Sequence, residues 1–384
     1  MKVPQIKNFF LFLAIPIFFA SCVQQNSKTA QKEELRPIRT IEQWENYQKK
    51  GLAPKNIERI FCSGGTLRLA VYLQCADRVI ATDGNERNES NRNGMKAYLA
   101  AHPELATLPI AGESSGRDNP ELLLSLKNPP QLIIKADTGA GYDPEELTRR
   151  TGIPVALVPM RGITVGRAEF DAGLRLMGTA LNQRRRAEEV ITFFDNEIAE
   201  LKKRTTGIAE ETKPAVYVGG VSYNGSHGFN SSEAGYPPFD LVKAREFLKN
   251  HRNDPILGNR HQIISKEKIL EWNPDAMFLD LGTLGLQNAS GLSELQNDSS
   301  YRSLAAVQSG KVYALLPNTF YFVNHDAVLA NGWFVGKTLY PDRFADIDPK
   351  KKADEIFTFL VGKPVFQQLN ENLQNLAFER LTLN

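Results

Sequence analysis

Apolar and polar positions alternate along the first half of the chain in a way that predicts short buried strands separated by helices. Runs of consecutive apolar residues are typical of strands buried on both faces, and apolar residues three or four positions apart are typical of helices. We expect strands over 58–62, 77–83, 108–111, 131–135 and 154–159, and helices over 67–75, 119–126 and 144–151. Strands and helices in this order predict a mostly parallel sheet that is covered by helices on both faces.

The alternation stops between residues 167 and 204, where apolar residues recur at helical spacing and no proline interrupts them. Gly173 and Gly178 are the positions at which such a helix could bend. At about 1.5 Å per residue, a helix of this length exceeds the width of one small domain. It is therefore predicted to link two lobes.

The alternation of strands and helices resumes after residue 206. We expect strands over 215–218, 276–280 and 312–316, and helices over 239–248, 263–271, 300–308, 327–339 and 351–360. The predicted fold class is α/β, with two Rossmann-like lobes whose sheets are mostly parallel. The predicted divisions are an N-terminal lobe over 38–165, a linking helix over 166–205 and a C-terminal lobe over 206–384.

The first residues have the pattern of a secretory signal peptide. Lys2 and Lys7 precede an apolar run over 9–19, which ends in Ala20-Ser21-Cys22. This run is shorter than the ~20 apolar residues that a membrane-spanning helix needs. We expect residues 1–21 to be a signal peptide. The small-small-Cys ending resembles a lipobox, although Phe19 stands where Leu is usual.

That resemblance implies a lipid on Cys22 and a periplasmic or cell-surface protein anchored to the membrane. The alternative is ordinary secretion, with no role for Cys22. Residues 22–37 are rich in Gln, Lys, Glu and Ser and poor in large apolar residues. Such a segment cannot bury enough apolar surface to offset the entropy lost on ordering, so we expect a flexible tether.

The charge balance excludes one class of partner. The chain has 46 basic and 44 acidic residues. Loss of residues 1–21 removes two lysines and leaves a formal charge of zero. A nucleic-acid-binding protein usually has a strongly basic face, so we expect no nucleic-acid partner.

Cys62 and Cys75 are predicted to be free thiols. Cys62 should end a strand and Cys75 should end the helix that follows it. Ten helical residues extend ~15 Å, whereas the Cα atoms of a disulfide lie within ~7 Å.

Four stretches of the chain resemble the periplasmic binding proteins of iron-siderophore, haem and cobalamin importers. The resemblance extends over about 59–363. The stretches are Asn119–Lys127 with Gln131–Ile134, Lys268–Asp280, Tyr301–Leu316 and Tyr340–Phe344. Asn128-Pro129-Pro130-Gln131 departs from the family pattern, in which a Pro-Asp pair usually precedes the strand.

The resemblance implies two lobes joined by one long helix, and a binding role without catalysis. The ligand would be a metal chelate, which an ABC permease and its ATPase would import. Aromatic and arginine residues near the expected cleft favour an anionic ferric siderophore, while haem, cobalamin or another chelate remain alternatives. We expect no intrinsic cofactor, no bound metal and a monomer whose lobes move little.

Candidate ligand contacts follow the predicted strands, because ligands of open α/β sheets bind beyond the carboxyl ends of the strands. In the N-terminal lobe these residues are Ser63, Gly64, Gly65, Arg68, Asp137, Thr138 and Arg161. Small residues at a helix start leave backbone N–H groups open to an anion. The alternative is a tight turn in which Arg68 faces solvent or pairs with an acid. Weaker candidates are Glu86, Arg87, Glu113 and Ser114.

Two segments of the C-terminal lobe are candidates for the opposite wall. The segment 217–239 is longer than an ordinary connection, which is typical of functional loops. Its candidate contacts are Tyr223, His227, Phe229 and Tyr236, and those of the segment 317–326 are Phe320, Tyr321, Asn324 and His325. His227 and His325 could together ligate a metal, although histidines without fixed spacing more often form only hydrogen bonds.

Two other functions fit parts of the sequence. A chelatase-like tetrapyrrole enzyme would also have paired α/β lobes, but the signal peptide and tether count against it. The sequence has no His-Glu-x-x-His or Cys-x-x-Cys motif, and Ser63-Gly64-Gly65-Thr66 lacks the lysine of a phosphate loop. A surface adhesin or sensor could keep the same fold without an importer.

Overall fold

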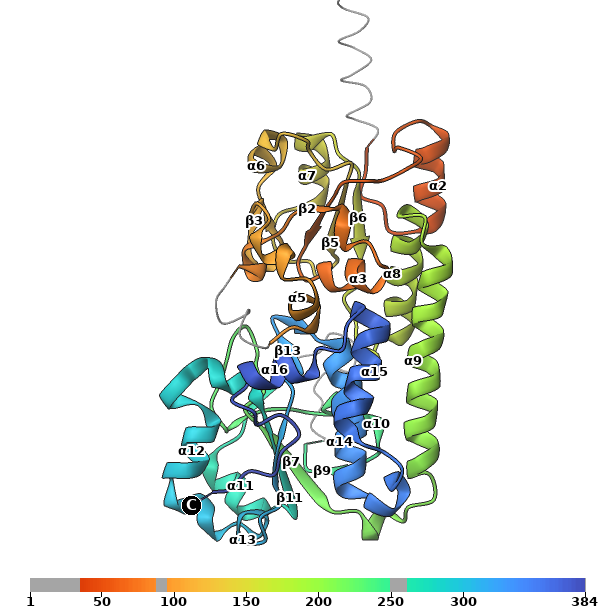
Figure 1. Ribbon diagram of the computed structural model, residues 1–384. Helices are drawn as coiled ribbons and strands as arrows, with labels where there is room; N and C mark the ends of the chain where they lie inside the picture. Colours follow the sequence, from red (N-terminus) through yellow and green to blue (C-terminus); the bar gives the residue numbers. More distant parts are fainter. Residues whose placement is uncertain (1–34, 88–94, 249–260, 384) are drawn as a thin grey trace, which may run out of the picture.

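The chain folds into two α/β lobes, as a computed structural model shows for residues 35–87, 95–248 and 261–383 (Figure 1). The predicted signal peptide, Cys22 and the tether up to residue 34 lie outside the described residues. The predicted fold class is confirmed. Within the described residues, no helix is long and apolar enough to cross a membrane.

Each lobe is built on a four-stranded parallel sheet. The N-terminal sheet has the order β2-β1-β5-β6, formed by β1 Ile60–Ser63, β2 Val79–Ala81, β5 Leu132–Ala136 and β6 Val155–Val158. The C-terminal sheet has the order β12-β11-β7-β9, formed by β7 Ala215–Gly219, β9 Arg245–Glu246, β11 Ala276–Asp280 and β12 Val312–Leu315. The central strands are apolar along nearly their whole length because helices cover both faces.

Short antiparallel pairs extend from the carboxyl ends of these sheets. They are β3 Gly112–Glu113 with β4 Arg117–Asp118, β8 Ser231–Glu233 with β10 His261–Ile263, and β13 Thr319–Phe320 with β14 Phe322–Val323. The pair β13–β14 forms a hairpin, which we call the 319–323 hairpin. The expected strand over 108–111 is instead a single bridge between Thr82 and Ile110.

The N-terminal lobe has α2 Ile41–Lys49, α3 Leu67–Tyr72, α5 Ala97–Ala101, α6 Pro120–Ser125 and α7 Pro144–Thr151. The C-terminal lobe has α10 Pro237–Leu241, α11 Lys266–Trp272, α12 Gly291–Asn297, α13 Ala305–Gln308, α14 His325–Leu339, α15 Pro349–Val361 and α16 Phe366–Asn372. The expected helix over 239–248 was wrong after Leu241, where the chain turns and adds β9 as an edge strand.

Short 3₁₀ segments of three to nine residues complete both lobes. Their bounds are η1 Ala76–Arg78, η2 Gly84–Glu86, η3 Pro103–Thr107, η4 Ser114–Gly116, η5 Glu210–Thr212, η7 Leu281–Ala289, η8 Ser299–Ser303 and η9 Pro341–Phe344.

The expected single linking helix is two packed helices, α8 Arg167–Ala180 and α9 Arg184–Thr205 (Figure 1). The break comes at Asn182, whose φ of 57° is left-handed, a conformation that asparagine tolerates better than most residues. Gly178 lets the helices approach closely, since a Cβ there would lie 2.7 Å from the Cβ of Ala187. With 22 residues, α9 still reaches along both lobes.

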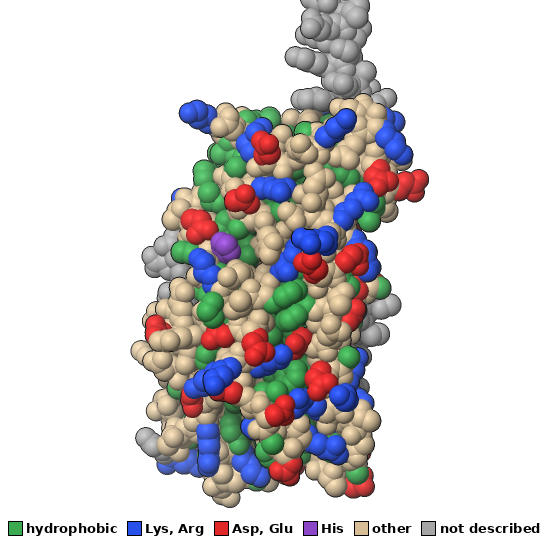
Figure 2. Space-filling view, turned by 45° about the vertical axis from the view of Figure 1, so that its right-hand side comes forward, with side chains coloured by type: hydrophobic (Ala, Val, Ile, Leu, Met, Phe, Trp, Pro, Cys, Tyr) green, Lys and Arg blue, Asp and Glu red, His purple; other side chains and the backbone are tan. Residues whose placement is uncertain are grey.

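The outer side of the linking helices carries acidic and basic side chains interspersed with one another (Figure 2). Arg175 pairs with Glu188 across α8 and α9 at 2.7 Å, and Arg184 pairs with Glu45 of α2 at 2.8 Å. Such exposed pairs each stabilise a fold by about 0–1 kcal/mol, so they orient these helices more than they stabilise them.

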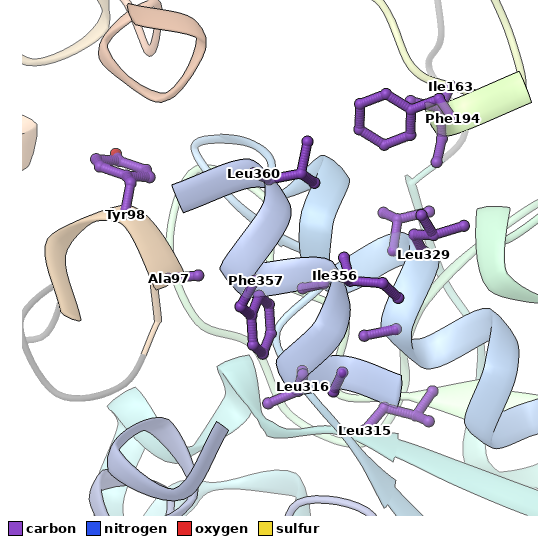
Figure 3. Close-up of a cluster of buried hydrophobic side chains, with 14 of the residues drawn as sticks. Ala97, Tyr98, Ile163, Phe194, Leu315, Leu316, Leu329, Ile356, Phe357 and Leu360 are labelled. Carbon is purple, nitrogen blue, oxygen red and sulfur yellow. The ribbon is translucent and has the colours of Figure 1, made fainter. Parts of the chain in front are cut away.

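One hydrophobic core runs through both lobes. Ala97 and Tyr98 of α5 belong to the same buried cluster as Phe357 and Leu360 of α15 and Leu316 after β12 (Figure 3). A smaller cluster, which includes Phe61, Ile133 and Leu157, belongs to the N-terminal lobe alone. Lobes that share a large apolar interface are expected to move less than lobes that meet through polar contacts.

The two cysteines of the described chain are free and buried, as expected. Burial raises the pKa of both thiols, that of Cys75 to about 11. A thiol held in its protonated form is a poor nucleophile and a poor metal ligand, so both cysteines serve as core residues.

Candidate functional site

The lobes meet where the turn after β1 faces the 319–323 hairpin. Arg68 of α3 is 1% exposed and crosses this boundary. Its Nη1 donates to the carbonyl oxygens of Phe322 (3.0 Å) and Val323 and to Oδ1 of Asn324 (3.1 Å). Arg68, a predicted ligand contact, joins the two lobes in this structure, and its side chain shows neither the solvent-facing nor the acid-paired alternative. Contact with a ligand stays a prediction. Because this guanidinium is bonded to the hairpin, it is not directed at a ligand in this structure.

The absence of a side chain in the turn after β1 makes room for the 319–323 hairpin. A Cβ at Gly65 would lie 2.6 Å from ring carbons of Phe322, so only glycine admits that ring. The N–H of Gly64, expected to be open to an anion, donates to Oδ2 of Asp83 at 2.9 Å. Thr66, the residue before α3, does not cap this helix, since its hydroxyl donates to backbone carbonyls instead.

Ser63 lies in a buried polar cluster beneath the turn. Its hydroxyl donates to Oδ1 of Asp118, whose Oδ2 accepts from Nζ of Lys135 at 2.6 Å. Both side chains of this ion pair are at most 2% exposed. The predicted contact Ser63 is therefore covered in this structure, and it orients the carboxylate that pairs with Lys135.

The other three N-terminal candidates lie nearer the surface. Asp137 is 3.7 Å from Nε of Arg39, and the hydroxyl of Thr138 accepts from the N–H of Ala140 at 3.3 Å. Arg161 is half-buried and forms no ion pair or hydrogen bond with any residue that the structure describes. Its aliphatic part packs on Gly166, where a Cβ would lie 2.7 Å away. Arg161 is therefore a cation still available for a ligand.

Loop 220–230 of the C-terminal lobe presents an aromatic and imidazole surface. Tyr223 is 44% exposed and stacks on His261, with ring centroids 4.6 Å apart and planes 9° apart. The centroid of His227 lies 5.1 Å from that of His261. We call Tyr223, His227 and His261 the Tyr-His-His cluster. The structure does not support the suggested pairing of His227 with His325, because the ring beside His227 is that of His261.

Two predicted contacts from the same segment are core residues. Phe229 is fully buried and meets Tyr217 and Tyr301 edge to face. Tyr236 is also fully buried, and its hydroxyl donates to Oδ2 of Asp280 at 3.1 Å. Neither side chain presents a surface to a ligand in this structure, because aromatic residues that hold a long loop in place are themselves covered by it.

Asp280 organises the carboxyl end of the C-terminal sheet. It is fully buried and accepts from the N–H groups of Gly282 and Asn318, both at 2.9 Å, as well as from Tyr236. Burial raises the pKa of this carboxyl to about 7, and the three donors oppose the rise. The carboxylate of Asp280 thus holds in place the three loops that contain Gly282, Asn318 and Tyr236.

The residues predicted on the 319–323 hairpin and just after it are mostly covered. Phe320 is 3% exposed, and Tyr321 is half-buried with a left-handed φ of 63°. The amide of Asn324 donates to the carbonyls of Met95 and Pro317 at 2.8 and 2.9 Å. Asn324 therefore joins the lobes, and Tyr321 alone of these three keeps part of its surface free.

His325 begins α14 inside the core. Its ring lies 4.6 Å from that of Phe170, and neither ring nitrogen has a hydrogen-bond partner among the described residues. Burial, with smaller contributions from Arg68 and Arg167, lowers its pKa to about 3. His325 is thus a neutral packing residue in this structure.

A pocket of about 360 Å³ lies at the lobe junction, on the side of the linking helices. Residues 163–165 line it from the N-terminal lobe, and Asp240 and Leu241 line it from α10. Arg167 on its wall is already paired with Asp171 and Asp195, at 2.7 and 3.0 Å. Its mixed charges make this pocket a poor match for a strongly anionic ligand.

Three important residues were missed or undervalued from sequence. Asp280 is the last residue of β11 and Asp83 comes two residues after β2, but nothing in their spacing shows that they are buried. His261 is 34 positions from His227, far beyond the short spacings of zinc-finger motifs, and the pairing of β8 with β10 brings it to the loop.

Comparison with known proteins agrees with this architecture. Residues 66–319 match the sequence profile of the family described as periplasmic binding protein. The molybdate-binding protein MolA of Haemophilus influenzae is 21% identical over 334 residues, which cover 80% of this chain and 87% of MolA.

Solved structures share the fold at low identity. MolA bound to molybdate superposes with a TM-score of 0.64 at 17% identity, covering 81% of this chain and 95% of MolA. The TroA-like protein FepB of Veillonella parvula gives 0.61 at 20% identity, covering 80% and 93%. The haem-binding protein HutB of Vibrio cholerae gives 0.53 at 16% identity, covering 74% and 100%.

The family profile spans most of both lobes, and the structures confirm the two-lobed fold expected for a substrate-binding component of an ABC importer. The chain therefore belongs to the periplasmic binding protein family.

Proposed function

We propose that this chain captures an anionic, metal-containing solute and delivers it to an ABC permease. The observation that carries the proposal is Arg161, a half-buried cation in the loop after β6 that no described residue neutralises. A buried or half-buried charge is normally paired, so an unpaired arginine near a lobe junction is well placed to receive an anion. The role is one of binding, without catalysis.

A ferric siderophore is the first candidate ligand. Its size suits the Tyr-His-His cluster, where Tyr223 offers an exposed flat surface. An exposed aromatic surface fits a large chelate better than it fits a small ion. Haem and cobalamin are further chelates that the same surface could contact.

Molybdate is the second candidate, and the likeness to MolA favours it. A small oxyanion needs hydrogen-bond donors and positive charge but no aromatic wall. Arg161 would serve either ligand, whereas Tyr223 would serve only a large chelate.

The test is a binding titration of the purified chain with ferric siderophores, haem, cobalamin, molybdate and tungstate, followed by calorimetry and native mass spectrometry. We expect Arg161→Met to weaken binding of the true ligand at least about tenfold, which corresponds to one lost charge-assisted contact. The control is Arg185→Met, which removes an arginine whose side chain is 94% exposed on α9.

A second variant separates the two candidates. Tyr223→Ala should weaken binding of a chelate and leave binding of molybdate unchanged. If none of these solutes binds, or if Arg161→Met binds as tightly as the unchanged chain, the proposal fails.

We also propose that the chain is a lipoprotein anchored through Cys22. Metabolic labelling with a radioactive fatty acid should mark the unchanged protein and leave Cys22→Ala unlabelled. Labelling of both, or of neither, would contradict the anchor.

A further inference from the structure

His227 and His261 are spaced like two ligands of one metal ion. Their ring centroids are 5.1 Å apart and their planes are inclined at 42°. Imidazole nitrogens bind zinc at about 2.0–2.1 Å, so two imidazoles on a tetrahedral ion have centroids about 5 Å apart. The separation in this structure thus allows both rings to reach the same ion.

Hydrogen bonds assign the proton on each ring. Nε2 of His227 lies 2.7 Å from the carbonyl oxygen of Tyr223, which can only accept, so this nitrogen carries the proton. Nε2 of His261 lies 2.8 Å from the hydroxyl of Ser231, whose own proton goes to the carbonyl of Val221 at 2.6 Å. The hydroxyl therefore accepts from His261, and Nε2 of this ring is protonated as well.

Both rings consequently present an unprotonated Nδ1, and no described residue bonds to either atom. A histidine that ligates a metal typically donates its other N–H to a backbone carbonyl or a similar acceptor, which fixes the tautomer and the ring. His227 has this arrangement through Tyr223, and His261 has it through Ser231. The stack of Tyr223 on His261 restrains that ring further.

We propose that His227 and His261 bind one divalent transition-metal ion through their Nδ1 atoms. Imidazole ligands suit zinc, nickel and copper. Within the described residues no third His, Cys, Asp or Glu joins the pair, so water or a small anion would fill the other positions. The site lies in the same Tyr-His-His cluster that a chelate would contact, but its test uses only the bare ion and does not depend on which solute the chain carries.

The test is calorimetry of the full chain, purified in detergent without a histidine tag, with NiCl₂ and ZnCl₂ in turn. We expect one ion per chain. His261→Phe keeps an aromatic ring beneath Tyr223 but cannot ligate, and His227→Asn removes the other ligand. Each should weaken binding at least about tenfold, since even changes behind the ligands of metal sites cost about 10- to 100-fold.

The matched control is His102→Asn. This histidine bonds to Glu104 and to the carbonyl of Val361, away from the cluster, and its loss should leave metal binding unchanged. Pulsed electron paramagnetic resonance of the Cu²⁺-loaded chain should count two coordinated imidazoles, and one in either site variant. Unaltered affinity in His261→Phe, or a spectrum with fewer than two imidazoles in the unchanged chain, would overturn the proposal.

Discussion

The two lobes fix the loops at the ends of their sheets with different electrostatics. In the N-terminal lobe, Lys135 pairs with Asp118 at 2.6 Å and Lys96 pairs with Glu86 at 3.0 Å, all of them nearly inaccessible to solvent. In the C-terminal lobe, Asp280 has only neutral donors: two backbone N–H groups and the hydroxyl of Tyr236.

This difference predicts which changes should destabilise each lobe. A buried ion pair is sensitive to the loss of one partner, which leaves an uncompensated charge. A buried carboxylate with neutral donors has no counter-charge, so its own protonation is the weak point. The ion pairs of the N-terminal lobe should therefore be sensitive to substitution, whereas Asp280 should be sensitive to pH, as should Asp83 of the N-terminal lobe, whose pKa is also raised by burial.

The largest expected effect comes from Lys135→Met, which leaves Asp118 charged and buried without its cation. We expect a loss of about 3–5 kcal/mol in the free energy of unfolding, measured with guanidinium chloride. The double variant with Asp118→Leu should recover most of this loss, since both charges are then absent. A single variant within about 1 kcal/mol of the unchanged chain would show that this pair does not hold the lobe.

Arg68→Met tests the boundary between the lobes. It removes the hydrogen bonds from the guanidinium to the 319–323 hairpin and leaves carbonyl groups unpaired, at a cost of about 2–3 kcal/mol. Hydrogen exchange should become faster at residues 319–324 and stay unchanged in β5. Unchanged exchange at the hairpin would mean that Phe322 against Gly65 suffices to hold it.

Asp280→Asn tests the C-terminal half of the comparison. An amide cannot accept on its nitrogen, so the variant loses part of the three-donor arrangement, at a cost of about 2 kcal/mol at neutral pH. The pH dependence is more informative. The folded pKa of about 7 lies above the ordinary value of 3.8, so the group favours folding most at low pH, and this contribution is lost as pH rises from about 4 to 7.

The stability of the unchanged chain relative to Asp280→Asn should therefore fall across that window. Parallel stability curves for the two proteins between pH 4 and 7 would show that Asp280 titrates normally.

The smallest effect is expected for His325→Phe, at the boundary itself. The unpaired ring nitrogens disappear and packing on Phe170 is kept, so we expect a gain of up to about 1 kcal/mol at pH 7. The folded pKa of about 3 lies below the ordinary 6.5, so the histidine's contribution is lost as pH falls through this range. Thermal midpoints should show a flatter acid limb in the variant, and an equally steep limb would argue against the assignment.

The sequence predicted the sheets better than the site for a physical reason. Residues 132–136 and 276–280 are apolar along nearly their whole length, and burial on both faces leaves such a run few alternatives. The break at Asn182 leaves the helical period almost unchanged, so periodicity alone predicted one linking helix.

Burial of single side chains was harder to infer. Arg68, Phe229 and His325 have the residue types of a ligand wall, and the sequence does not show that all three are buried in this structure. The long loop 220–230 was rightly singled out as unusual, but its partner His261 depends on a pairing between distant strands. Whether Tyr223, His227 and Arg161 contact a ligand stays a prediction.

The core shared by the two lobes bears on how an importer would recognise a loaded carrier. Halves that are joined through Tyr98, Phe357 and Leu360 cannot separate far without exposing apolar surface to water. A bound ligand would then change the surface of the loops around the cleft more than it changes the distance between the lobes. A permease would therefore have to distinguish the loaded protein by the shape and charge of a few loops. The ligand-free protein would compete with the loaded one for the same docking site.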